Sequence, residues 1–341
     1  MSTATTLPPL QHDGPGDQPR ALSQAYDPAD KVFRAVARVG GIIVLAVMLL
    51  VGFFLTKNGL EAISAVGLPD FLTTKEWDPE THHFGILAVL TGTLMIAAVA
   101  LAVSVPLAIG TALFISEVAT GGLRRFLSSA VDLMAALPSV VIGLWGLSYF
   151  QPHVIGFCRW VSTWFGWIPF LRVPAADPSN PLPNDAAFTA STFIAGIIVG
   201  LMIIPIQTSM MVEAFSRAPV GEREGAFALG ASRWGMIRAV VLPFGKGGII
   251  GGVMLGMGRA LGETIAVYLI ISPVFFINGH ILATGSNSVA ALIALRYGEA
   301  SGFSMSALMA AGLALFVLTM IINFSASAII ARSRSGAESE G

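Results

Sequence analysis

The stretch Glu224-Gly225-Ala226-Phe227-Ala228-Leu229-Gly230, followed after nine residues by Val240-Val241-Leu242-Pro243, decides how this fold is read. Alanine, phenylalanine and leucine give its first half an apolar side. Gly230 permits a turn that a side chain would resist, and Ser232 is placed to cap a following helix. The sequence therefore predicts a helix, a glycine turn and a second helix within a loop over residues 213–246.

Apolar side chains are expected at the surface of this helical pair. Pro219 and Glu222 suit the start of the first helix, and Trp234, Met236 and Ile237 follow the turn. A short amphipathic unit of this kind cannot bury its own apolar side. It therefore needs either the lipid interface or a groove on a partner protein.

The composition around this loop is that of a membrane protein. Of the 341 residues, 55% are hydrophobic and 11% are charged, against about 25% charged residues in soluble domains. This composition excludes a soluble globular enzyme, a disordered chain and a nucleic-acid binder, which needs concentrated basic surface. Cys158, the single cysteine, excludes a disulfide framework within the chain, and we expect it to be a small apolar residue.

Six apolar runs are long enough for a helix to cross a hydrocarbon core about 30 Å thick. We therefore expect an all-α polytopic membrane protein. The predicted spans are 39–55, 84–115, 126–150, 188–212, 247–277 and 305–331. A further apolar segment, 154–171, contains three tryptophans, and tryptophan concentrates at the headgroup level. We expect it to be an interfacial or re-entrant helix within an outside loop over 151–187.

The distribution of positive charge orients these six spans. With the N-terminus inside, 13 of the 19 lysine and arginine residues fall on the inner side, five fall outside, and Arg259 lies within a span. The positive-inside rule then predicts that both termini are cytoplasmic. The expected domains are a cytoplasmic tail over 1–30, a transmembrane domain over 31–332, and a second cytoplasmic tail over 333–341. Glycines at 248, 252 and 256 predict close approach of another helix to the fifth span.

The loop over 213–246 resembles the EAA motif of ABC-importer permeases: Glu-Ala-Ala, three residues, Gly, nine residues, Ile, any residue, Leu-Pro. All spacings hold, with Gly225 in place of an alanine and Val240 in place of isoleucine. The resemblance implies a type I importer permease with the MetI-like fold, whose coupling helices dock into a groove on an ATPase subunit. The implied coupling residues are Glu224, Gly225, Ala226, Gly230, Arg233, Trp234, Leu242 and Pro243.

A second resemblance concerns the cargo. Gly258-Arg259-Ala260-Leu261-Gly262-Glu263-Thr264 is similar to a stretch of phosphate-importer permeases, and residues 135–144 are similar to the third-span region of that family. The resemblance covers about residues 31–332 and implies that Arg259 and Glu263 act in phosphate translocation. It also implies a homologous second permease subunit, a cytoplasmic ATPase dimer, an extracytoplasmic phosphate-binding protein, and a location in the bacterial plasma (inner) membrane.

The residues themselves support part of this role. Arg259 follows Lys246 by 13 residues, which is about 20 Å along a helix and deep in a bilayer. A charge there must face the interior of the bundle, and a guanidinium can grip phosphate oxygens with two parallel hydrogen bonds. Glu263, four residues on, is expected on the same face within ion-pair reach, so a purely structural ion pair is the alternative. Thr264 and Ser139 can donate hydrogen bonds to a passing anion, or simply pack helices together.

The other polar residues are weaker candidates for a part in transport. Asp132 is expected early in the third span, near the interface, and Glu117 as a solvated residue at the end of the second span. His82 and His83 lie near acidic residues, but no third fixed ligand is evident, so no metal site is expected.

Several catalytic motifs are missing from the sequence. Gly245-Lys246-Gly247 lacks the glycine spacing and the hydroxyl of a phosphate-binding loop, and neither HExxH nor GxSxG occurs. The chain is therefore not expected to be an enzyme, and ATP and magnesium are expected on the partner ATPase. Two alternatives remain open. One is a permease for sulfate or molybdate, and the other is a non-ABC membrane enzyme that uses Arg259, Glu263 and Asp132.

Overall fold

The computed structural model describes residues 28–176 and 184–335. The chain divides into two compact units, residues 1–51 and 52–341. The predicted tails, 1–30 and 333–341, lie largely outside the described ranges, and so do residues 177–183 of the predicted outside loop.

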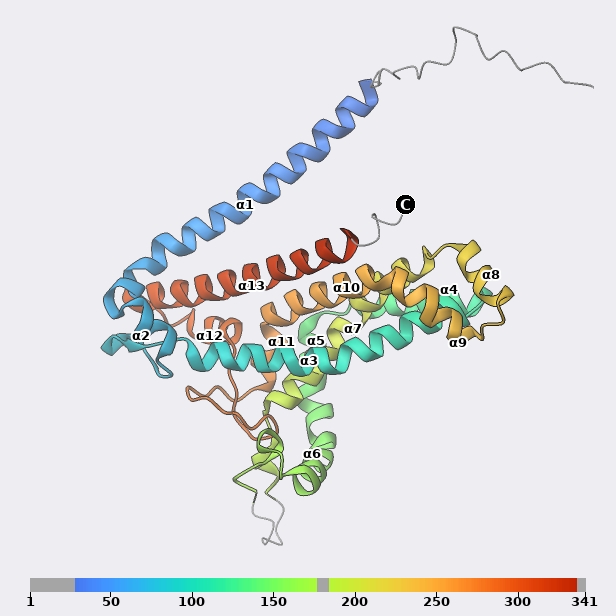
Figure 1. Ribbon diagram of the computed structural model, residues 1–341. Coiled ribbons are helices and arrows are strands. Elements are labelled where there is room, and N and C mark those ends of the chain that lie inside the picture. The colour runs from blue at the N-terminus through green and yellow to red at the C-terminus, as the bar shows by residue number, and fades with distance from the viewer. Residues whose placement is uncertain (1–27, 177–183, 336–341) are drawn as a thin grey trace, which may run out of the picture. The chain divides into compact units, whose positions relative to one another are not determined.

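Helices provide nearly all of the regular structure in the described residues (Figure 1). The first elements are α1 (Pro28–Val66), α2 (Leu68–Thr73), β1 (Trp77–Asp78), β2 (His83–Phe84), α3 (Leu87–Leu113) and α4 (Gly121–Ala135). The middle elements are α5 (Ser139–Trp145), α6 (Gln151–Phe165), α7 (Thr192–Ser216), α8 (Val220–Ala228) and α9 (Arg233–Met236). The last are α10 (Leu242–Gly262), α11 (Ile265–Ile270), α12 (Val289–Arg296) and α13 (Phe303–Ser335). The two strands pair antiparallel, with Trp77 opposite Phe84.

Six helices among the described residues are long and apolar enough to cross a membrane, which confirms the predicted number of spans. In hydrocarbon every backbone polar group must find its partner within the protein, and a continuous helix meets this requirement. The six are Ala29–Val66, Leu87–Val118, Ser139–Phe165, Thr192–Ser216, Arg233–Gly262 and Phe303–Ser325. The third and the fifth differ most from their predicted positions.

The predicted third span, 126–150, is wrong at both ends. Residues 126–135 belong to α4, a separate helix with no buried residue that packs on α7. The break after α4 comes from Pro138, because proline lacks an N–H and disfavours helical backbone in the residue before it. Pro138 itself is extended, and the span begins at Ser139.

The span continues through the segment that we expected to form an interfacial helix. A π-helical turn, Gly146–Phe150, joins α5 to α6, so the separate helix predicted within 154–171 is instead the end of the third span. The Gln151 N–H bonds to the Gly146 carbonyl, five residues back. This wider turn accommodates Pro152, whose ring would clash with a carbonyl in a regular α-helix.

The fifth span is shifted in the same way. A second π-helical turn, Ile237–Val241, joins α9 to α10 immediately before Pro243. Residues 233–246 are therefore helical, and the connection predicted over 213–246 shrinks to 217–232 between α7 and α9. At its other end α10 stops at Gly262 rather than continuing to residue 277, and α11 follows after a short break.

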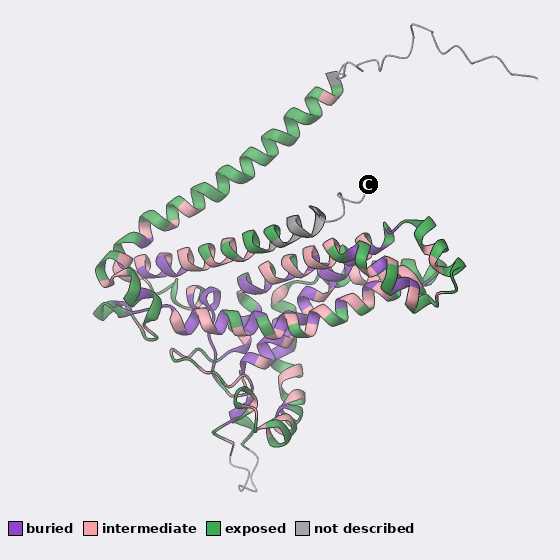
Figure 2. Cartoon of the chain, viewed as in Figure 1, coloured by how far each residue is buried: buried purple, intermediate pink, exposed green. Residues whose placement is uncertain are grey.

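Close packing of α10 on α7 confirms the prediction from the glycine spacing. A Cβ added at Gly248 would lie 2.0 Å from the Cβ of Ala214, and one at Gly256 would lie 2.3 Å from Nε2 of Gln207. Side chains at these positions would hold the two helices apart. Helix α7 is the centre of the bundle, with 61% of its most apolar window buried, against 28% for α3 and for the fifth span. Figure 2 shows this concentration of buried residues.

Adjacent glycines of α10 offer a direct test of this packing. We expect Gly248→Ala to destabilise the protein by about 1–3 kcal/mol because the new methyl group overlaps Ala214. Gly247→Ala adds the same group where nothing lies within 4 Å, so it should be neutral or stabilising by up to about 1 kcal/mol. Thermal unfolding in detergent measures both. Equal effects of the two substitutions would contradict the close approach.

Candidate functional site

The connection between α7 and α9 forms the helix, glycine turn and helix that the sequence predicts. Helix α8 begins after Pro219, and Gly230 has φ of 82°, a conformation that glycine adopts readily. The hydroxyl of Ser232 accepts a hydrogen bond of 3.2 Å from the N–H of Gly235 and caps α9. We call residues 220–236 the α8–α9 hairpin. It lies at one end of the helical bundle (Figure 1).

The hairpin presents large apolar side chains to its surroundings. Leu229 is 91% exposed, Trp234 is 61% exposed and Phe227 is 47% exposed. The expectation for Met236 and Ile237 is wrong, because both are buried in a cluster with residues of α3 and α7. One side of the hairpin is therefore anchored to the bundle, while the other side is open.

The residues implied in coupling are distributed along this unit. Of them, Glu224, Gly225, Gly230, Arg233, Trp234 and Pro243 are exposed, whereas Ala226 and Leu242 are half-buried. Within the described residues the carboxylate of Glu224 has no ion-pair or hydrogen-bond partner. Leu242 and Pro243 belong to the start of α10 and connect the hairpin to the fifth span.

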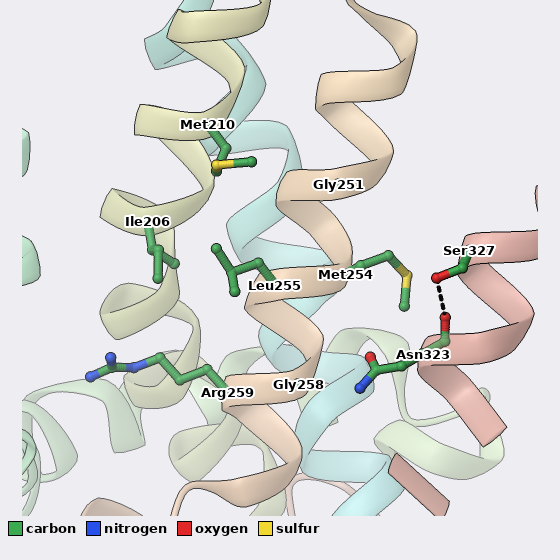
Figure 3. Close-up of a pocket in the computed structure, with 9 residues that line it drawn as sticks. All are labelled: Ile206, Met210, Gly251, Met254, Leu255, Gly258, Arg259, Asn323 and Ser327. Carbon is green, nitrogen blue, oxygen red and sulfur yellow. Dashed lines mark hydrogen bonds between the residues drawn. The ribbon is translucent and has the colours of Figure 1, made fainter. Parts of the chain in front are cut away.

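Arg259 lies in the last turn of α10, three residues before the helix ends. It lines an open cavity of about 630 Å³, to which α7, α10 and α13 contribute. Figure 3 shows the guanidinium reaching past α10 on the side away from α13. The side chain is exposed, and in the described part of the chain it has no ion-pair partner. A free guanidinium in this place can bind an anion without first breaking another contact.

The predicted ion pair between Arg259 and Glu263 is wrong. Helix α10 ends at Gly262, and Glu263 has extended backbone with ψ of 122°. None of the ion pairs among the described residues includes Glu263 or Arg259, although the two residues are four positions apart. Glu263 is half-buried beyond the end of the helix.

Ser139 and the break after α10 lie at the same level of the bundle. A Cβ at Gly143 of α5 would lie 2.9 Å from the Cα of Ala266, and one at Gly146 would lie 3.2 Å from Cδ1 of Ile270. These contacts advance in the same direction along both chains, so α5 and α11 run parallel. Ser139, the first residue of α5, therefore lies beside the start of α11.

The backbone break itself is stabilised locally. The hydroxyl of Thr264, half-buried in the break, donates a hydrogen bond of 3.1 Å to the carbonyl of Gly262. This carbonyl is one of the last four in α10, which have no partner within the helix. The Thr264 hydroxyl oxygen remains able to accept a second hydrogen bond.

Two polar residues that line the cavity were not predicted from the sequence. Asn323 and Ser327 of α13 line the same cavity as Arg259, and the Ser327 hydroxyl donates to the Asn323 carbonyl at 2.9 Å (Figure 3). Nothing in the sequence separates them from other small polar residues in membrane helices.

The structure also contradicts the predictions for two acidic residues. Asp132 lies on α4 rather than in the third span, and its carboxylate accepts a hydrogen bond of 3.4 Å from Ser209. Glu117, expected to be solvated, is 3% exposed and forms an ion pair with Arg223 of α8 at 3.0 Å. No local pattern connects two residues 106 positions apart.

Comparison with known proteins gives the family. Residues 104–335, more than half of the chain, match the family described as "Binding-protein-dependent transport system inner membrane component". The chain belongs to this family. The matched region begins within α3 and contains both the α8–α9 hairpin and Arg259. Members of the family are permease components of ABC transporters rather than enzymes.

Individual relatives agree with this family. The chain is 35% identical over 299 residues to the phosphate transport system permease protein PstC of Pasteurella multocida, covering 85% of this chain and 88% of that protein. A solved bacterial ABC transporter involved in the import of alginate matches with a TM-score of 0.54 at 18% identity, covering 89% and 99% of the two chains. The inward-facing methionine transporter MetNI matches with a TM-score of 0.51 at 13% identity, covering 76% and 99%. These likenesses confirm the predicted MetI-like fold.

Thiol labelling tests the exposure of the permease side chains. Cys158 is 0% exposed, and only an accessible thiolate reacts readily. We therefore expect the native protein in detergent to react slowly with a maleimide, whereas the Arg259→Cys variant gains a site that reacts at least about tenfold faster. Labelling of Cys158 after denaturation in dodecyl sulfate is the control. Equally slow labelling at position 259 would contradict the exposure of that side chain.

Proposed function

We propose that this chain is a transmembrane permease subunit that carries inorganic phosphate through an ATP-driven importer. The single observation that supports this most strongly is the 35% identity to a phosphate permease over 85% of the chain. The exposed, unpaired guanidinium beside a cavity supplies chemistry that suits an oxyanion. The chain moves phosphate and catalyses no reaction of its own.

Arg259 is the residue proposed to bind phosphate in transit. A positive charge within a bilayer costs a few kcal/mol on insertion scales, so a cationic side chain in a span calls for a function. Guanidinium is planar and presents parallel N–H donors that match two oxygens of a phosphate group. The passing anion neutralises the charge, and the charge in turn lowers the barrier that hydrocarbon presents to the anion.

Neighbouring polar groups are proposed to complete the passage. Ser139 and Thr264 lie near the break after α10 and offer hydroxyl groups that can hydrogen-bond phosphate. Glu263 adds a negative charge one residue beyond the end of α10. Its repulsion weakens phosphate binding, so that the anion is released again instead of remaining bound.

The α8–α9 hairpin is proposed to be the docking site for an ATPase. Its exposed leucine and tryptophan form an apolar side of the size that fits a groove on a partner. The unpaired carboxylate of Glu224 lies on α8 of the same hairpin and can bind a cation of the ATPase. ATP and magnesium are held by that partner, and its movements are transmitted to the spans through the start of α10.

A complete transporter needs further chains. We propose a homologous second permease, a cytoplasmic ATPase dimer and an extracytoplasmic phosphate-binding protein, assembled in the bacterial plasma (inner) membrane. The hairpin and both termini face the cytoplasm, which agrees with the excess of lysine and arginine on that side. Alternating access then results when the two permease halves rock between outward-open and inward-open states around the site at Arg259.

Charge removal at Arg259 tests the translocation role. We expect Arg259→Gln to lower ATP-dependent phosphate uptake into proteoliposomes by at least about a hundredfold, because the loss of a charged hydrogen-bond pair inside a bilayer costs several kcal/mol. Arg259→Lys keeps the charge but loses the planar fork, and should retain part of the uptake. Arg217→Gln, which breaks an exposed ion pair at the far end of α7, is the control. Near-normal uptake by Arg259→Gln in an assembled complex would refute the role.

The same assay separates the possible cargoes. Excess sulfate or molybdate should leave the uptake of labelled phosphate unchanged. Strong competition by either anion would favour the alternative oxyanion permease. Turnover of a phosphate ester by the purified chain alone would support a membrane enzyme instead.

A charge placed on the hairpin tests the docking role. Leu229→Asp puts a carboxylate on the most exposed apolar side chain of the hairpin, so the ATPase should no longer copurify with the permease in detergent. Leu229→Met, which preserves an apolar side chain of similar size, is the matched control. Unchanged recovery of the ATPase with Leu229→Asp would overturn the docking site.

A further inference from the structure

A buried ion pair joins the α8–α9 hairpin to two membrane spans. Nη1 of Arg223, on α8, lies 3.0 Å from Oε2 of Glu117 in the π-helical turn (Phe114–Val118) that ends the second span. Nη2 of the same guanidinium donates a hydrogen bond of 2.6 Å to the carbonyl of Phe215 in the last turn of α7. One side chain of the hairpin therefore contacts α7 and the extension of α3 together.

Burial distinguishes this pair from the other described ion pairs. Glu117 is 3% exposed and Arg223 is 20% exposed. In every other ion pair of the described residues, both side chains are at least 41% exposed. Exposed pairs contribute little because water screens them, whereas two charges in a low-dielectric interior attract each other strongly and resist separation.

The rest of α8 is held less firmly. None of its residues is buried, and its main packing partners are α9 and the π-helical turn at Ile237–Val241. Phe215, whose carbonyl accepts the bond from Arg223, belongs with Ala218 to a buried apolar cluster. Movement of α8 relative to α3 and α7 must therefore either carry these spans along or pull charged groups apart in an apolar environment.

We propose that Arg223 and Glu117 form a mechanical link that carries displacement of the α8–α9 hairpin to α3 and α7 during transport. This inference rests on the proposed docking of an ATPase at the hairpin. Arg223 is a positioning residue in this role, since it contacts neither cargo nor nucleotide. Loss of the link leaves the ATPase docked and active but lets the hairpin move without the spans.

The pair also has a second arrangement available. Within the described residues, Oε1 of Glu117 and Nε of Arg223 are buried without a hydrogen-bond partner. Guanidinium and carboxylate commonly form two parallel hydrogen bonds. A small rotation of α8 can bring Nε to Oε1, so the two groups stay bonded while the hairpin changes position.

The test uses the complete complex of both permeases, the ATPase and the binding protein in proteoliposomes. Glu117→Gln keeps the shape of the side chain but removes its charge. We expect the amount of phosphate taken up per ATP hydrolysed to fall by about tenfold, a coupling change of about 1.4 kcal/mol, while ATPase copurification stays normal. Arg223→Lys, which keeps the charge without the fork, should give a smaller loss. Glu213→Gln, which breaks the exposed pair with Arg217, should leave the ratio within about twofold.

Two results would overturn the link. One is an unchanged ratio in an intact Glu117→Gln complex. The other is a parallel fall of uptake and ATP hydrolysis that follows the amount of folded complex, because it would mean that the pair only stabilises the fold.

A second readout does not depend on the cargo. Gly110→Cys introduces a thiol on α3 where nothing lies within 4 Å, and Cys158 is buried and gives little background. The labelling rate of the thiol at position 110 should change when a non-hydrolysable ATP analogue is added. In the Glu117→Gln background this rate should not change. Persistence of the change in that background would refute the link. If the complex with Gly110→Cys alone shows the labelling change but takes up no phosphate, only the phosphate assignment is refuted.

Discussion

Hydrocarbon gives an unpaired backbone amide or carbonyl no partner, so each one costs several kcal/mol, and this constraint governs the whole chain. It explains why the apolar runs become continuous helices and why the described structure contains so few other elements. The same constraint makes the points where helices stop candidates for a functional site. Pro138 ends the continuity between α4 and α5, and α10 stops at Gly262. The parallel contacts of α5 and α11 bring these two interruptions to the same level. Non-helical backbone at membrane depth is tolerated where it is covered by protein or lines a cavity.

Arg259 lies one turn before the second interruption, and this position suits a transient anion site. Among the described residues no carboxylate pairs with its guanidinium, and this includes Glu263 at the end of α10. A permanent ion pair would have neutralised the charge and left little affinity for phosphate. The C-terminal dipole of α10 stabilises the cation in the last turn, so the helix end favours the arginine even when no anion is present.

The other end of the bundle is organised by charge as well as by apolar packing. The α8–α9 hairpin has an anchored side, with Met236 and Ile237 in an apolar cluster, and an open side, with Leu229 and Trp234 exposed. Such a division suits an element that must remain attached to the spans while another protein binds it. The pair of Arg223 and Glu117 adds an attachment that resists separation, and apolar contacts that slide over one another do not have this property.

The sequence alone determined the number of spans, the hairpin with its glycine turn, and the close packing at Gly248 and Gly256, because each depends on local spacing and residue type. It also pointed to Arg259, since a charge within an apolar run is conspicuous. The tertiary structure decided where helices continue or stop. Pro152 is accommodated by a widened turn, whereas α10 ends at Gly262. Among the described residues Arg259 forms no ion pair with Glu263. The tertiary structure also decided that Glu117 pairs with Arg223, because two residues so far apart in the chain meet only after the helices have packed.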